Sequence, residues 1–199
     1  MKRIWLIRHG ESIANAGEAT QDHRNIPLSE LGLKQAQALA LQIPKKPDLI
    51  VTSPYLRAQQ TAMCTIGRFP DTVTGIWDCV HEFVYLAPAT CVGTTSQQRR
   101  PRVINYWRKL DPDYVDGEGA ESYRQLIGRI ERDATDRSLR GILDRHLGFD
   151  RPVPMRKHET AFFVEHLLEL LPRVDPGNHR LAVVERLPVD VLLNFGHQA

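Results

Sequence analysis

The sequence is poor in cysteine and has no long apolar segment. Its three cysteines are odd in number and form no Cys-x-x-Cys pair, which argues against a disulfide framework and favours reduced thiols. Apolar runs such as residues 161–164 are far shorter than the roughly 20 residues that a membrane-spanning helix needs. No apolar leader with a cleavage site follows the first basic residues. We therefore expect a cytoplasmic protein without a membrane partner.

The chain also lacks a strong net charge, an internal repeat and any low-complexity segment. Its formal charge is +2, with 42% hydrophobic and 25% charged residues, which is ordinary for a globular protein and gives no reason to expect nucleic acid as a partner. The length suits a single domain over residues 1–199. The late histidines are not spaced as in HxxH or HExxH, so we expect no metal and no other cofactor.

Short apolar runs and amphipathic segments alternate along the first half of the chain. Residues 3–8 and 49–51 have the pattern of buried strands, and residues 30–43 and 57–66 have that of helices. This alternation predicts an α/β fold with a mainly parallel sheet. Residues 94–110 are mixed in polarity and interrupted by Pro101. Further along the chain we expect helices from about residue 121 and over 160–171, and strands over 181–184 and 189–195.

Several residues with reactive or charged side chains follow the ends of the expected strands. His9 comes directly after the first strand, between Arg8 and Gly10, and Ser53 follows the second. A third apolar stretch begins at Ile76 and leads to Glu82. Ligands of open parallel sheets bind beyond the carboxyl ends of the strands, so these side chains are expected to converge on one crevice.

A histidine beside an arginine at a strand end suits phosphoryl transfer. A neutral imidazole is a good nucleophile near pH 7, and a guanidinium group offsets the negative charge of a phosphoryl group through a planar fork of donors. The alternative is that His9 has no catalytic role and is a surface histidine at the end of a strand. The tripeptide Arg8-His9-Gly10 alone does not decide between the two.

Three ordered motifs favour the catalytic interpretation. The stretches LIRHGES at residues 6–12, PLSELG at 27–32 and SPYLRAQQTA at 53–62 resemble those of the histidine phosphatase superfamily, the phosphoglycerate mutase-like proteins. DPDYVDGEGAESY at residues 111–123 looks like a segment of its broad-specificity phosphatases. The resemblance is clear over 1–132 and weak over 133–199, and it implies a three-layer fold in which helices flank the sheet.

The resemblance implies a role for each matching residue. His9 resembles the histidine that accepts the phosphoryl group, and Glu82 resembles the general acid. Arg8, Asn15 and Arg57 resemble residues that bind the phosphate. Without the resemblance, Arg57 reads as a surface cation on a helix, Asn15 as a turn residue and Glu82 as a solvated carboxylate.

Other polar residues either belong to the site or are ordinary surface residues, and the sequence leaves both interpretations open. Arg99, Arg100 and Arg102 either grip an outer anionic part of the substrate or form a solvated face, and the solvated face is favoured. His23 and Arg24 either line the mouth of the pocket or belong to a polar loop.

The family usually has a second catalytic histidine after an apolar strand, and no residue here matches that pattern well. His197 follows the apolar run 191–196, but it lies late, and Gln198 stands where the family has glycine. His158 is nearer the expected distance, yet prolines interrupt the residues before it. We expect His197 to complete the site. The alternative is that the late histidines are all structural.

The sequence therefore predicts a metal-independent phosphomonoester hydrolase that acts through a phosphohistidine on His9. Its substrate is expected to be a small-molecule or protein phosphomonoester, and the sequence fixes neither its identity nor the oligomeric state. A mutase is the nearest alternative, although residues 16–26 lack the Asn-Arg-Phe-like stretch and Gly-Trp pair of family mutases. The other alternative is a non-catalytic protein that binds phosphate or phosphopeptides.

Overall fold

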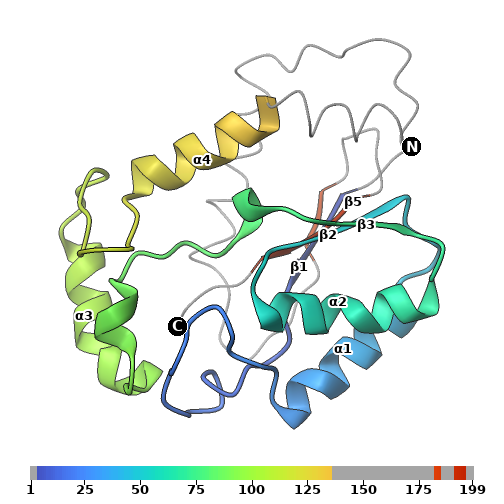
Figure 1. Ribbon diagram of the computed structural model, residues 1–199, viewed down its shortest axis with the longest axis horizontal. Coiled ribbons are helices and arrows are strands. Elements are labelled where there is room, and N and C mark those ends of the chain that lie inside the picture. Colours follow the sequence, from blue (N-terminus) through green and yellow to red (C-terminus); the bar gives the residue numbers. More distant parts are fainter. Residues whose placement is uncertain (1–3, 136–181, 185–190, 196–199) are drawn as a thin grey trace.

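A five-stranded sheet forms the centre of the chain in this computed structural model, which describes residues 4–135, 182–184 and 191–195 (Figure 1). The strand order is β3-β2-β5-β1-β4. The strands are β1 (Ile4–Arg8), β2 (Leu49–Thr52), β3 (Val73–Ile76), β4 (Ala182–Val184) and β5 (Val191–Phe195). Only β4 among them runs antiparallel to its neighbour. The predicted α/β class with a mainly parallel sheet is confirmed.

Strand β5 comes from the far end of the chain but lies between β1 and β2. Its last residue, Phe195, pairs with Arg8, and Asn194 pairs with Thr52. Because all three strands are parallel, their carboxyl ends meet at one edge of the sheet. The residues that follow β1 and β2 therefore begin beside the end of β5.

The burial of each strand matches its place in the sheet. All residues of β2 are buried, as expected for an inner strand that is covered on both faces. Strand β3 alternates between half-buried and exposed residues, which is the pattern of a strand at an edge. The sequence placed the third apolar stretch from Ile76 onward, whereas β3 ends there and a 3₁₀ turn, η1 (Asp78–Val80), follows.

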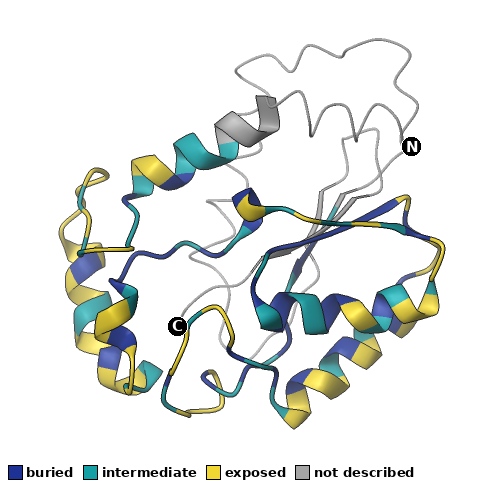
Figure 2. Cartoon of the chain, viewed as in Figure 1, coloured by how far each residue is buried: buried dark blue, intermediate teal, exposed yellow. Residues whose placement is uncertain are grey.

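Helices α1 (Glu30–Gln42) and α2 (Leu56–Arg68) lie side by side on one face of the sheet (Figure 1). Ile7 and Ile50 from the strands pack against Ile43 and Ala62. Figure 2 shows this buried interior and the exposed outer turns of both helices. The Ser29 hydroxyl caps α1 by accepting from the Gly32 amide, as predicted. Helix α2 begins at Leu56, two residues after Pro54.

Two glycines allow the loop after β1 to lie against the start of α1. A Cβ atom on Gly32 would lie 2.0 Å from the Glu11 carbonyl oxygen, and one on Gly10 would lie 2.6 Å from the Gly32 carbonyl oxygen. These distances are far below van der Waals contact, so neither position accepts a side chain. The close contact fixes the backbone that follows His9.

Two further helices build the other side of the molecule: α3 (Ser96–Arg108) and α4 (Tyr123–Thr135). A short 3₁₀ turn, η2 (Pro88–Cys91), precedes α3. Helix α3 runs through Pro101, which the sequence analysis took as an interruption. A capping box between Thr95 and Gln98 fixes the first turn of this helix.

None of the helices that the structure describes is both long and apolar enough to pass through a membrane. The helix expected over 160–171 lies outside the described residues. The strands expected over 181–184 and 189–195 are confirmed over 182–184 and 191–195 as β4 and β5. None of the three cysteines forms a disulfide, as the sequence indicates.

Candidate active site

His9 is the first residue after β1, and its ring is held in a buried position at the edge of the sheet. Its side chain is 4% exposed, and Nδ1 lies 2.5 Å from the Gly10 carbonyl oxygen. A carbonyl only accepts, so Nδ1 carries the proton and the Nε2 lone pair remains. The Gly10 amide donates to Thr61 Oγ1 on α2 at 3.0 Å. This bond ties the loop that carries His9 to a helix.

Burial keeps the His9 ring neutral. Desolvation lowers the pKa of His9 from 6.5 to about 4, and the charge of Arg57 lowers it as well, while Glu82 acts in the opposite direction. The charge of Arg8 also lowers the pKa. At neutral pH the ring is therefore an uncharged base with its Nε2 lone pair intact, which is the form that can act as a nucleophile.

Arg57 lies on the first turn of α2 and contacts both His9 and Glu82. Its Nε donates to His9 Nε2 at 3.1 Å, and Nη1 donates to the His23 carbonyl oxygen at 2.8 Å. Its Nη2 forms an ion pair with a Glu82 carboxylate oxygen. Because the side chain is only 3% exposed, the alternative of a surface cation on a helix is wrong.

Glu82 lies in an extended segment after η1 and is 4% exposed. The alternative of a solvated carboxylate is therefore also wrong. Arg129 of α4 donates to the carbonyl oxygens of Cys79 and His81, and its guanidinium pairs with Glu121 at 2.6 Å. This arginine holds the backbone that leads into Glu82. Sequence reasoning missed Arg129, since no local pattern links it to residues about fifty positions away.

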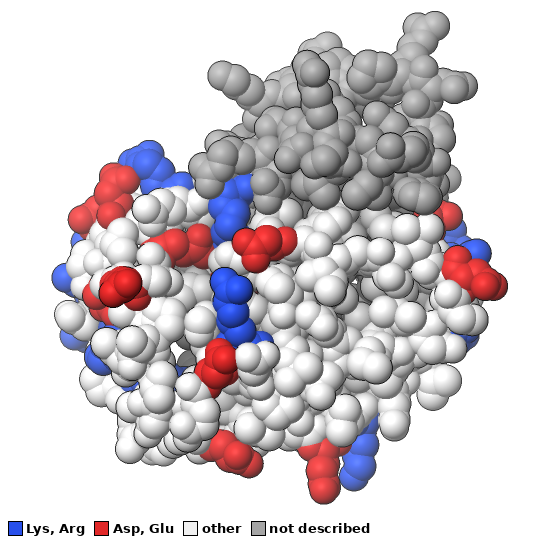
Figure 3. Space-filling view, viewed as in Figure 1, with Lys and Arg blue, Asp and Glu red and all other residues white. Residues whose placement is uncertain are grey.

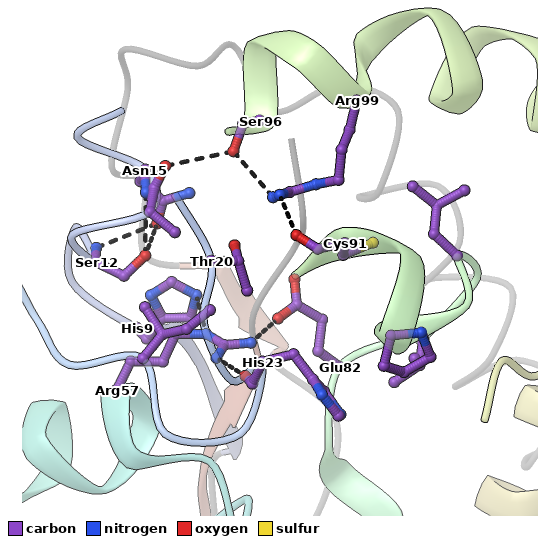
Figure 4. Close-up of a pocket in the computed structure, with 15 residues that line it drawn as sticks. His9, Ser12, Asn15, Thr20, His23, Arg57, Glu82, Cys91, Ser96 and Arg99 are labelled. Atoms are coloured by element: carbon purple, nitrogen blue, oxygen red, sulfur yellow. Dashed lines mark hydrogen bonds and ion pairs between the residues drawn. The ribbon is translucent and has the colours of Figure 1, made fainter. Parts of the chain in front are cut away.

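One pocket collects most of the predicted site residues (Figure 4). It contains about 490 Å³ of space between protein atoms, and this volume includes space that is open to solvent. Its lining comprises His9, Ser12, Ala14, Asn15, Thr20, His23, Ile26, Arg57, Glu82, Val84, Leu86, Pro88, Cys91, Ser96 and Arg99.

The remaining predicted residues divide between the pocket and its surroundings. Asn15 lines the pocket, and its Oδ1 accepts from the Ser12 amide at 3.2 Å and from the Ser12 hydroxyl at 2.8 Å. Arg8 ends β1 and is half-buried, and its side chain is not part of the lining. His23 lines the pocket, whereas Arg24 is exposed outside it.

The three arginines at the start of α3 do not form one solvated face. Arg99 is 7% exposed and lines the pocket, so for this residue the favoured interpretation is wrong. Arg100 is exposed. Arg102 lies outside the pocket, where it pairs with Asp116 at 2.8 Å. Sequence reasoning also missed Ser12, Thr20 and Ser96, whose hydroxyls have no distinguishing local signal.

Both candidates for the second histidine, His158 and His197, lie outside the described residues. The strand that was expected before His197 is present as β5, and its last residue pairs with Arg8. Within residues 4–135 and the two C-terminal strands, no cluster of His, Cys, Asp and Glu is arranged to hold a metal ion. On the face seen in Figure 3, basic and acidic side chains are interspersed, without a large area of one sign.

Comparison with known families and sequences gives concordant matches. The model of the histidine phosphatase superfamily (branch 1) matches residues 4–141. Adenosylcobalamin/alpha-ribazole phosphatase of Escherichia coli K12 is 44% identical over 139 residues, which cover 64% of each protein. Probable phosphoglycerate mutase GpmB of Yersinia pestis is 36% identical over 63 residues, 31% of this chain and 29% of that protein. The chain thus matches less than two thirds of the length of these relatives.

Solved structures share the fold. Mycobacterial hydrolase 1 has a TM-score of 0.57 and 28% identity, with 76% of this chain and 69% of that chain covered. Mycobacterial glucosyl-3-phosphoglycerate phosphatase has a TM-score of 0.56 and 24% identity over 98% and 75% of the two chains. The alpha-ribazole phosphatase of Shigella flexneri has a TM-score of 0.54 and 20% identity over 96% and 72%. At these identities the last two matches show the fold alone, which is phosphoglycerate mutase-like.

Proposed function

The chain belongs to the histidine phosphatase superfamily, and from that premise we propose that it hydrolyses phosphomonoesters through a phosphohistidine on His9, without a metal ion. The observation that carries the proposal is the neutral, buried imidazole of His9, whose Nε2 lies 3.1 Å from a guanidinium nitrogen of Arg57 in a pocket. A nucleophile and a cation for its anionic target are thus already in contact.

In the first step, His9 Nε2 attacks phosphorus while the bond to the ester oxygen breaks. The electron pair of that bond leaves on the alcohol oxygen, which takes a proton from the Glu82 carboxyl group. In the second step, the Glu82 carboxylate removes a proton from water, the resulting oxygen attacks phosphorus, and the P–N bond breaks. Phosphate leaves and His9 regains its lone pair. A positioned acid of this kind contributes about 10²- to 10⁴-fold.

The ion pair between Arg57 and Glu82 is the starting point for substrate binding. A phosphate dianion competes with the Glu82 carboxylate for the guanidinium and carries more charge. Arg57 then stabilises the negative charge that spreads over the phosphoryl oxygens in transfer, where most catalysis of this reaction lies. Once the Arg57 guanidinium binds the phosphate in place of Glu82, the Glu82 carboxylate lies beside the substrate. There it can take up a proton and donate it to the leaving oxygen.

The other phosphate ligands in the proposal are Arg8, Asn15 and His197. The charge of Arg8 already acts on the His9 ring, and Asn15 lines the pocket. His197 is assigned to the site because β5, two residues before it, ends beside β1. The proposed partners are small-molecule or protein phosphomonoesters, not nucleic acid or membranes. The proposed location is the cytoplasm, where cysteines outside disulfides, such as those of this chain, stay reduced.

The decisive experiment measures phosphate release from a panel of phosphomonoesters in the presence of a chelator, with His9→Ala as the control. Brief mixing with labelled substrate should give a protein phosphate that is acid-labile and base-stable and that the variant lacks. A label on serine, or activity that a chelator abolishes and one divalent ion restores, would overturn the mechanism. Transfer of the phosphoryl group back to the product would favour a mutase, and phosphate binding without turnover would favour a binding protein.

A further inference from the structure

The end of the pocket away from His9 contains a buried cation that has no acidic partner among the described residues. Arg99 is 7% exposed, yet residues 4–130 hold no carboxylate within ion-pair distance of it. By contrast, Arg57 at the other end is paired with Glu82. A buried charge is costly to leave without a counter-charge. Within the described part of the chain, the positive charge of Arg99 in the wall of the pocket is thus not balanced by a carboxylate.

The guanidinium of Arg99 is held in place by neutral acceptors. Its Nη1 donates to the Thr94 carbonyl oxygen at 2.6 Å and to the Thr94 hydroxyl at 3.0 Å, and it lies 3.5 Å from the Cys91 carbonyl oxygen. Its Nη2 lies 3.5 Å from the Ser96 hydroxyl. No described residue accepts from Nε. The group is therefore rigid, and part of its donor capacity is unused.

A second observation at the same place is the hydroxyl of Thr20. This side chain is 4% exposed and lines the pocket, and its Oγ1 has no hydrogen-bond partner among the described residues. The Thr20 amide donates to the Thr94 carbonyl oxygen at 2.9 Å, the oxygen that also accepts from Arg99. Thr20 and Arg99 thus both donate to the Thr94 carbonyl oxygen. Figure 4 shows that the Thr20 hydroxyl points toward Arg99.

We propose that Thr20 and Arg99 form a second anion-binding subsite, which selects phosphomonoesters whose alcohol part carries a further anionic group. A carboxylate or a second phosphate supplies the missing counter-charge for Arg99 and an acceptor for the Thr20 hydroxyl. The start of α3 adds favourable potential, because Ser96 is its first residue. The inference rests on the proposed function, which assigns the transferred phosphoryl group to His9.

Binding of non-hydrolysable phosphonates tests the subsite without requiring turnover. Calorimetry should show that 3-phosphonopropanoate binds the wild-type protein roughly 10- to 100-fold more tightly than propylphosphonate, the range for a hydrogen bond to a charged group. Propane-1,3-bisphosphonate distinguishes a second phosphate from a carboxylate as the preferred anion. Equal affinity for propylphosphonate and for both probes that carry a second anionic group would overturn the subsite.

Variants separate the subsite from general damage. Thr20→Val, which removes only the hydroxyl, and Arg99→Gln should each reduce the affinity ratio of the two probes about tenfold, whereas Thr20→Ser should restore it. Arg100→Gln removes an exposed charge from the same helix turn and should leave the ratio as in the wild type. If Arg99→Gln does not fold, the comparison of Thr20→Val with Thr20→Ser tests the subsite on its own. A ratio unchanged in Thr20→Val would overturn the role of Thr20.

Turnover distinguishes failure of this inference from failure of the proposed function. The matched substrates are 3-phosphoglycerate and glycerol 3-phosphate, which differ in one carboxylate. Hydrolysis of both at equal kcat/KM, with equal affinity for the phosphonates, refutes the subsite and leaves the phosphatase proposal intact. Selective phosphonate binding without hydrolysis of any monoester refutes the proposed function and leaves the subsite intact.

Discussion

At the scale of single residues, burial decides the protonation state of His9. Its pKa is about 4 in the folded chain against 6.5 for an exposed histidine. The unfolded chain therefore binds more protons between these two values. The free energy of unfolding should be unaffected by His9 above pH 6.5 and should fall as the pH decreases from 6.5 to about 4.

We predict that the His9 ring does not titrate between pH 8 and pH 5.5, because its pKa is lowered to about 4. The measurement is an NMR pH titration of the imidazole signals, assigned by their loss in His9→Ala. A midpoint for His9 near 6.5 would show that the ring is solvated and would remove the physical basis for a neutral nucleophile in acid.

Glu82 has two opposite effects, which a single substitution separates. In Glu82→Gln no carboxylate competes with phosphate for Arg57, so inorganic phosphate should bind roughly tenfold more tightly. Turnover should fall about 10²- to 10⁴-fold on alkyl phosphates and much less on nitrophenyl phosphate, whose leaving oxygen needs little help from an acid. Calorimetry and steady-state kinetics give the two values. Weaker phosphate binding, or an equal loss on both substrates, would contradict these roles.

At the scale of elements, the site depends on how α4 holds the segment that carries Glu82. Arg129 bridges two backbone carbonyls of residues 79–81 to the carboxylate of Glu121. The Glu121 amide in turn donates to the Val84 carbonyl oxygen at 2.8 Å. The segment on both sides of Glu82 is therefore fixed to the start of α4. The position of the acid follows from this anchoring and not from a strand.

Arg129→Met should lower turnover on alkyl phosphates more than on nitrophenyl phosphate, because it displaces Glu82 and leaves His9 and Arg57 in place. Arg129→Lys should restore part of the difference, since it keeps the charge near Glu121. Steady-state kinetics on both substrates provides the readout, and the free energy of unfolding should fall by about 1–3 kcal/mol.

The matched control is Arg124→Met on the same helix. Arg124 pairs with Asp113, and both side chains are more than half exposed, so its loss should change stability and activity little. If Arg129→Met slows both substrates equally, Arg129 has only a structural role.

At the scale of the whole molecule, the sequence predicted the parts of the site that follow local patterns. The first strand is a short apolar run that His9 follows, and Arg57 lies in the first turn of the second predicted helix. The sequence could not show that Arg57 is buried against Glu82, since that contact joins residues 25 positions apart. It also favoured a solvated Arg99. The burial of that residue depends on carbonyls of the preceding turn, which composition does not reveal.

The same limit applies to β5. The sequence predicted this strand but not its position in the sheet. Its parallel pairing with both β1 and β2 brings the end of β5 to the edge where His9 lies. The family pattern predicts a second histidine at such a position. Of the two candidates, only His197 follows an unbroken apolar strand, whereas prolines precede His158.

We predict that His197→Ala lowers turnover roughly 10²- to 10³-fold, while His158→Ala has nearly wild-type activity. An imidazole opposite His9 would donate to a non-bridging phosphate oxygen, and loss of such a donor costs about 2.7–4 kcal/mol in the transition state. The measurement is kcat/KM on a nitrophenyl phosphate, with thermal unfolding to show that both variants fold. The reverse order of effects would mean that residues near His158 complete the pocket. No effect of either substitution in an active protein would assign the role to another group.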